Sequence, residues 1–147
     1  MAHVFNHRNM NRLDDPERKK YLPAEDLLLS MGLEKGKTFL DVGAGTGFFA
    51  FPARRIVGPE GRVIAVDSSP EMCDELSRRS REANAEITVK QSQGREFGVE
   101  PNTVDFVFLG SVLHEVDEKE TFLTALGVTL KPGGRIGIIE WGNDDLR

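Results

Sequence analysis

The sequence predicts an α/β fold in which helices cover both faces of a doubly wound parallel β-sheet. Residues 38–50 read TFLDVGAGTGFFA, the pattern of a strand, a glycine turn and a helix. Residues 63–67, VIAVD, are apolar at successive positions up to a final acid, as in a strand that is buried on both faces. Strands and helices then alternate along the chain, and right-handed crossovers join such elements into a parallel sheet.

Length and composition are those of a single globular domain, residues 1–147. Apolar residues make up 39% and charged residues 29%, which is typical of a soluble protein, and no apolar run reaches the ~20 residues of a membrane span. The single cysteine, Cys73, excludes an internal disulfide, so we expect a cytoplasmic protein. The net charge of −5 does not favour a nucleic-acid partner, although a local basic patch is compatible with that total.

Residues 1–20 are polar and partly basic, and we expect them to form an arm before the first helix. Two interpretations of this arm stay open: a solvated, partly frayed segment, or a lid that folds over a ligand. Pro23 suits the first turn of the helix that follows, and Gly32 suits its end. His3 and His7 have the spacing of metal ligands on a helix, but no acid or thiol pattern completes such a site, so no metal is expected.

Turn signals and apolar runs define the later elements. Thr46 is expected to cap the helix after the glycine turn, and Pro52 is expected to kink that helix or delay its start. Ser68 or Ser69 is expected to cap the next helix. Further strands are predicted near residues 87–89, 104–109 and 136–141, with a helix between the last two.

Polar residues and glycines occur where four of the predicted strands end. Asp41 and the glycine turn end the first strand, Asp67 ends the second, Gln93 follows the third, and residues 110–115 follow the fourth. Ligands of doubly wound sheets bind beyond the carboxyl ends of the strands, so these positions converge on one crevice. A carboxylate about twenty residues beyond a glycine turn typically accepts hydrogen bonds from ribose hydroxyls. We therefore expect an adenosine-bearing ligand.

The glycine spacing distinguishes this crevice from two other nucleotide sites. Gly43, Gly45 and Gly47 read G-x-G-x-G, whereas the dinucleotide fingerprint is G-x-G-x-x-G. The pattern G-x-x-x-x-G-K-[ST] is absent, so an ATP-type phosphate loop is not supported.

Four segments together resemble class I S-adenosylmethionine-dependent methyltransferases: FLDVGAGTGFF, VIAVD, VDFVFLGSVLHEV and LKPGGRIGIIE. The resemblance runs from residue 39 to about residue 141 and is strongest to the branch that holds ubiquinone/menaquinone-biosynthesis and related small-molecule methyltransferases. It implies a Rossmann-like sheet with strand order 3-2-1-4-5. The fold is expected to lack the two antiparallel strands with which longer family members end. Strand five would then form an edge that invites self-association.

The resemblance also implies roles for matching residues. Asp41 would orient the glycine loop and contact the methionine end of S-adenosylmethionine, and Asp67 would hold the ribose hydroxyls with Ser68 beside the adenine. Gln93 stands where relatives usually carry an acid that accepts from the adenine amino group, and an amide oxygen still accepts. The full implied cofactor-binding set is Asp41, Gly43, Ala44, Gly45, Asp67, Ser68, Gln93, Gly94 and Gly110.

Other interpretations of these residues stay open. Asp41 also suits an acid that satisfies loop N–H groups, and Asp67 also suits a cap for the following helix. His114 is the candidate catalytic base, because imidazole titrates near neutral pH, but it also suits a plain strand-to-helix turn.

The resemblance implies in-line transfer of a methyl group to a small-molecule acceptor (EC 2.1.1.-), without a metal or a covalent nucleophile. Arsenite methylation, which uses several cysteines, is disfavoured because the chain has only Cys73. The N-P-P-[YF] signature of enzymes that methylate nucleic-acid amino groups is absent as well. Two alternatives remain: a module that binds S-adenosylmethionine without activity, and an NAD-dependent oxidoreductase.

Overall fold

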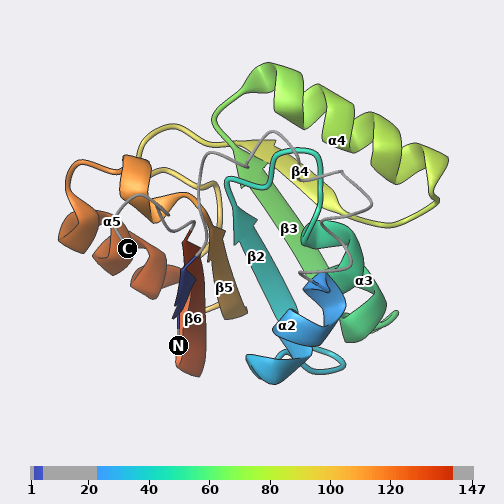
Figure 1. Ribbon diagram of the computed structural model, residues 1–147, viewed down its shortest axis with the longest axis horizontal. Coiled ribbons are helices and arrows are strands. Elements are labelled where there is room, and N and C mark those ends of the chain that lie inside the picture. Colours follow the sequence, from blue (N-terminus) through green and yellow to red (C-terminus); the bar gives the residue numbers. More distant parts are fainter. Residues whose placement is uncertain (1, 5–22, 141–147) are drawn as a thin grey trace.

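The structure is a computed structural model that describes residues 2–4 and 23–140. Its centre is a six-stranded sheet in the order β1-β6-β5-β2-β3-β4, and all five strand pairs are parallel. We expected five strands in the order 3-2-1-4-5. In the structure these five strands are β4, β3, β2, β5 and β6, and they lie side by side in that order, so the predicted fold class is confirmed (Figure 1). The strands are β1 (Ala2–Val4), β2 (Thr38–Val42), β3 (Arg62–Asp67), β4 (Thr88–Gln91), β5 (Val104–Gly110) and β6 (Leu130–Glu140).

Helices cover both faces of this sheet (Figure 1). They are α2 (Ala24–Ser30), α3 (Ala50–Val57), α4 (Pro70–Glu82) and α5 (Lys119–Thr129), and a 3₁₀ turn, η2 (Leu113–Glu115), precedes α5. Helices α2, α3 and α4 share one apolar core with Phe39 of β2, whereas α5 shares a second core with Leu40. Neighbouring residues of β2 thus enter different cores, because side chains alternate across a strand.

Local chemistry sets where two of the helices begin. Helix α3 starts at Ala50 with Phe49 as its N-cap residue, so the expectation that Thr46 caps this helix was wrong. Pro52 lies in the first turn of α3, where backbone N–H groups have no partner within the helix, so its missing N–H costs no helical hydrogen bond. The later start of the helix that we expected from Pro52 is confirmed. Ser69, one of the two predicted caps, accepts a hydrogen bond from the Met72 amide at 3.2 Å and begins α4.

Strand β6 is not the edge strand that the sequence predicted. Strand β1 pairs with it in parallel, with residues 2–4 in register with residues 138–140. A three-residue strand is too short to produce a periodic signal, and the unpaired backbone groups of β6 favour such a partner. The rest of the arm, residues 5–20, lies outside the described residues, and so does its interpretation as a lid.

The parallel strands place their carboxyl ends at one edge of the sheet (Figure 1). The turns that follow β2, β3, β4 and β5 meet at this edge, as expected for the ligand crevice of a doubly wound sheet. Among residues 2–4 and 23–140, none of the helices combines the length and the apolar composition needed to cross a membrane.

Candidate functional site

A cavity of about 710 Å³ opens at the carboxyl ends of the strands. Its lining comes from the turn after β2, the end of β3, the start of α4, the segment after β4, and the region from β5 to α5. Most of the residues expected from the sequence to form one site do line it: Gly43, Gly45, Asp67, Ser68, Gly94 and Gly110.

The glycine turn has a backbone that other residues adopt with difficulty. Gly43 and Gly45 have positive φ angles of 74° and 58°. A Cβ atom on Gly43 would lie 2.3 Å from a methyl carbon of Val112, whereas a Cβ on Gly45 would meet no atom within 4 Å. The first glycine therefore permits close packing against the segment after β5, and the second leaves room at the cavity. Ala44 is buried and does not line the cavity; its amide donates to the Val66 carbonyl at 3.0 Å.

Asp67 connects the glycine turn to the next helix. One carboxylate oxygen accepts from the Gly45 amide at 2.9 Å, and the other accepts from the Ser69 amide at 2.9 Å. The cap of α4 is Ser69 rather than Asp67, and Asp67 supports it by accepting from the amide of the cap residue. Each carboxylate oxygen has a second lone pair, so Asp67 retains acceptor capacity toward the cavity that it lines.

Asp41 is a buried carboxyl group whose side chain is paired with no other described residue. The residue is 3% exposed, and none of the hydrogen bonds in the described part of the chain reaches its carboxyl group. Burial raises the pKa of Asp41 to about 8, and the charge of Asp67 acts in the same direction. The alternative in which Asp41 satisfies loop N–H groups therefore has no support in this structure. A buried carboxyl group without a partner is costly, and a cation or donor supplied by a ligand would remove that cost.

The end of β4 contributes a different residue from the one predicted. Gln93 is exposed and does not line the cavity; it exchanges backbone hydrogen bonds with Glu96 at 3.0 and 2.8 Å. Ser92 is buried and lines the cavity, and its amide donates to the Asp67 carbonyl at 2.9 Å. A shift of one position in an extended segment turns a side chain to the opposite side, so the sequence located this segment but not its facing residue.

Apolar side chains form part of the cavity lining, and we call this part the apolar wall. Phe97 and Phe122 pack edge to face, with ring centroids 5.6 Å apart and an angle of 82°, and Met72, Val112 and Val116 complete the lining here. Sequence reasoning missed this wall because its members come from separate elements. A flat, largely apolar group suits such a surface.

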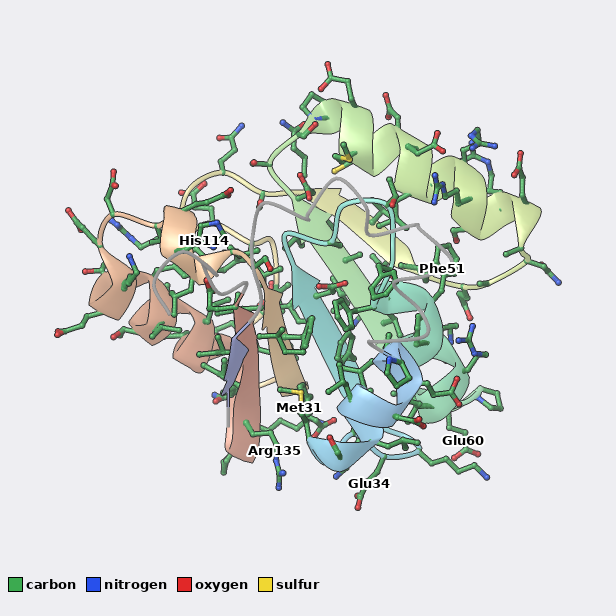
Figure 2. The ribbon with its side chains drawn as sticks, viewed as in Figure 1. Met31, Glu34, Phe51, Glu60, His114 and Arg135 are labelled. Carbon is green, nitrogen blue, oxygen red and sulfur yellow. The ribbon has the colours of Figure 1, made fainter. Side chains whose placement is uncertain are left out.

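His114 lies on η2, beside the cavity rather than in its lining. Its Nδ1 atom is 2.9 Å from Oε1 of Glu140, at the end of β6. The other oxygen of Glu140 accepts from the Leu113 amide at 3.0 Å. Figure 2 shows His114 well away from Arg135 and Glu34, which lie toward the lower edge of the view. Glu140 was missed by sequence reasoning although it, too, is an acid at a strand end.

No group of three metal-ligating side chains occurs among the described residues. The side chains of His3 and His7 lie outside them.

Comparison with known proteins places these features in context. A family model described as "Methyltransferase domain" matches residues 39–134. A demethylmenaquinone methyltransferase of Oceanobacillus iheyensis is 28% identical over 98% of this chain and 63% of its own length. An arsenite methyltransferase of Halobacterium salinarum is 34% identical over 70% of this chain and 27% of its own length. The chain thus spans less than two thirds of either curated relative.

A solved structure shows the same likeness in three dimensions. The crystal structure of a SAM-dependent methyltransferase from Aquifex aeolicus superposes with a TM-score of 0.85 at 33% identity, covering 93% of this chain and 73% of that one.

Proposed function

The chain belongs to the family of S-adenosylmethionine-dependent methyltransferase domains, and we propose that it transfers a methyl group from S-adenosylmethionine to a small-molecule acceptor. The observation that carries this proposal is the combination at one cavity of a positive-φ glycine turn and the acid Asp67. The carboxyl group of Asp41, at the end of the same strand as the turn, is buried outside that lining and has no partner among the described residues. The turn and Asp67 suit a nucleoside, and Asp41 suits an ammonium group.

The residues present fit this cofactor. The free lone pairs of Asp67 would accept from the ribose hydroxyls, and Ser68 would lie beside the adenine. We also propose that Ser92, which lines the cavity, lies near the adenine. The family resemblance favours Gln93 for the same place. The ammonium group of the methionine end would stabilise the ionised form of Asp41. The backbone near the methionine end would come from Gly43, Ala44, Gly45 and Gly110, and that near the adenine from Gly94.

The chemistry needs alignment more than it needs reactive side chains. When bound, S-adenosylmethionine supplies a methyl group that its sulfonium centre has already activated for displacement. The chain's own task is to hold the acceptor in line with that methyl group and to exclude water, for which the apolar wall of Phe97 and Phe122 is suited. His114, adjacent to this wall in sequence and beside the cavity, is the proposed proton acceptor.

The acceptor class follows from the cavity and the relatives. An aromatic ring carrying hydroxyl groups fits the apolar wall, and several relatives are named as demethylmenaquinone methyltransferases. The first acceptor to test is therefore 1,4-dihydroxynaphthalene, the reduced ring system of demethylmenaquinone. Arsenite is the second, since one relative is an arsenite methyltransferase, although the chain has a single cysteine. That single cysteine is also why we propose a cytoplasmic setting.

Two measurements test the proposal. Calorimetry should detect binding of S-adenosylmethionine and of S-adenosylhomocysteine, with much weaker binding of NAD. Tighter binding of NAD would favour the oxidoreductase alternative and overturn the proposal. Transfer of a radiolabelled methyl group to 1,4-dihydroxynaphthalene or arsenite should then follow. Binding without transfer to any acceptor of a broader small-molecule panel would instead favour the inactive binding module.

A further inference from the structure

Glu140 makes two connections from the end of β6 to the turn beside the cavity. Oε1 lies 2.9 Å from Nδ1 of His114, and Oε2 accepts from the Leu113 amide at 3.0 Å. The Glu140 side chain is 21% exposed and that of His114 is 29% exposed, so the pair is shielded from much of the solvent. The residues flanking His114 in the same turn, Val112 and Glu115, line the cavity itself.

This contact selects one tautomer of the neutral imidazole. A carboxylate only accepts hydrogen bonds, so it favours the form in which Nδ1 carries the proton. Nε2 then becomes the basic nitrogen of the ring. It lies 3.6 Å from Oε2 of Glu115, a residue of the cavity lining. Glu115 and Glu140 both lie within 4 Å of the His114 ring.

We propose that Glu140 is a positioning residue that holds His114 with Nε2 as the base for acceptors that lose a proton on methylation, namely hydroxyl groups and activated ring carbons. The inference rests on the proposed methyl transfer. In the step, the acceptor oxygen or carbon bonds to the methyl carbon, and the carbon–sulfur bond breaks with its electron pair left on sulfur. The acceptor's proton passes to Nε2, and the imidazolium later returns it to water.

A purely structural role for Glu140 makes different predictions. Because Glu140 also accepts from Leu113, and the Ser111 amide donates to the Ile139 carbonyl at 2.7 Å, the turn is fastened to β6 in two places. If fastening were the whole role, loss of Glu140 would lower stability and ligand affinity without changing the proton chemistry of His114. The tautomer and the pH profile of kcat therefore separate the two roles.

The first experiment measures the tautomer and needs no acceptor. Nitrogen-15 NMR of the histidine rings in the full chain, with His114 assigned through His114→Asn, should show Nδ1–H as the major neutral form. In Glu140→Ala the ratio of Nδ1–H to Nε2–H should fall about tenfold, the effect of losing a hydrogen bond to a charged group. Glu120→Ala, an exposed acid on α5, is the matched control and should leave the ratio unchanged. An unchanged ratio of the two tautomers in Glu140→Ala overturns the proposal, whatever the methyl-transfer activity of that variant.

The second experiment measures kcat against pH with S-adenosylmethionine and 1,4-dihydroxynaphthalene. Both His114→Asn and Glu140→Ala should lower kcat by about tenfold or more and change its dependence on pH, and the double variant should be no slower than His114→Asn. Glu140→Asp tests partial rescue. If the KM of the acceptor rises while kcat and its pH profile stay as in wild type, the role is structural and the proposal fails. If neither wild type nor any variant methylates an acceptor, that result counts against the proposed function. The tautomer measurement still tests the role of Glu140, because it needs no acceptor.

Discussion

The backbone amide of Gly45 donates a hydrogen bond of 2.9 Å to the carboxylate of Asp67, a residue 22 positions later in the chain. The same carboxylate accepts from the Ser69 amide, so one side chain joins the glycine turn after β2 to the start of α4. The two strands involved are neighbours in the sheet, with Val42 in register with Val66. The shape of the glycine turn therefore depends on an acid of the adjacent strand, and changes at this acid should affect folding and ligand binding together.

Asp67→Ala should weaken S-adenosylmethionine binding by about 1–3 kcal/mol, because it removes the carboxylate that would accept from the ribose. It should also lower the free energy of unfolding, because the Gly45 and Ser69 amides lose their acceptor. Calorimetry and urea denaturation measure the two effects. Asp74→Ala, at an exposed acid on the same helix that Asp67 helps to begin, is the control. Equal affinity in Asp67→Ala and wild type would remove Asp67 from the binding site.

Asp41 should make the ligand-free protein less stable as pH rises. The pKa of Asp41 is about 8 in the folded state against an ordinary value of 3.8, so the folded state binds more protons than the unfolded state between these values. The contribution of Asp41 to stability should therefore be fully present at and below about pH 4, fall as pH rises toward about 8 and level off above it, by a few kcal/mol in order of magnitude. Asp41→Asn should remove this component of the pH dependence. Urea denaturation of wild type and Asp41→Asn across this pH range measures the free energy of unfolding of each. If the two free energies change with pH in the same way, Asp41 ionises normally.

S-adenosylmethionine should release a proton when it binds, if its ammonium group approaches Asp41 and favours the ionised carboxylate. Calorimetry in buffers of different ionisation enthalpy counts that proton near neutral pH. Wild type should release a measurable fraction of a proton, and Asp41→Asn should release less while binding more weakly. If both proteins release the same number of protons on binding, the released proton comes from a group other than Asp41.

Gly43→Ala should destabilise the fold more than Gly45→Ala. Both changes place an L-residue at positive φ, which costs roughly 1–2 kcal/mol. Only the Gly43 change also drives a Cβ to within 2.3 Å of Val112, and overpacking adds about 1–3 kcal/mol. The double variant Gly43→Ala/Val112→Ala should recover part of the difference in urea denaturation. Equal losses for the two glycines would mean that the Val112 contact relaxes freely.

Removal of residues 1–4 should expose the backbone of β6 at residues 138–140, which β1 pairs in this structure. Unpaired strand edges associate with other chains, so the shortened protein should sediment as larger species as its concentration rises. The full chain run in parallel is the control. Identical sedimentation of both forms, with unchanged thermal stability, would show that β1 does not protect this edge.

Local patterns of residues were enough to predict a parallel sheet and which strand ends share a cavity, whereas the order of the five strands came from the family resemblance. Apolar runs, glycines and prolines act over a few residues, so β2, β3, β5 and the delayed start of α3 followed from local chemistry. Once the strands are parallel, their carboxyl ends meet at one edge, which is why Gly43, Asp67 and Gly110 were predicted to lie together and do.

Packing of the whole chain settles which neighbouring side chain faces the cavity and which distant groups meet. Ser92 rather than Gln93 lines it, because the direction of a side chain in an extended segment changes with every residue and depends on packing. The contact between His114 and Glu140 joins residues 26 positions apart, and the burial that raises the pKa of Asp41 exists only in the folded chain. Desolvation and long-range hydrogen bonds depend on the whole surroundings of a group, which local patterns of residues do not encode.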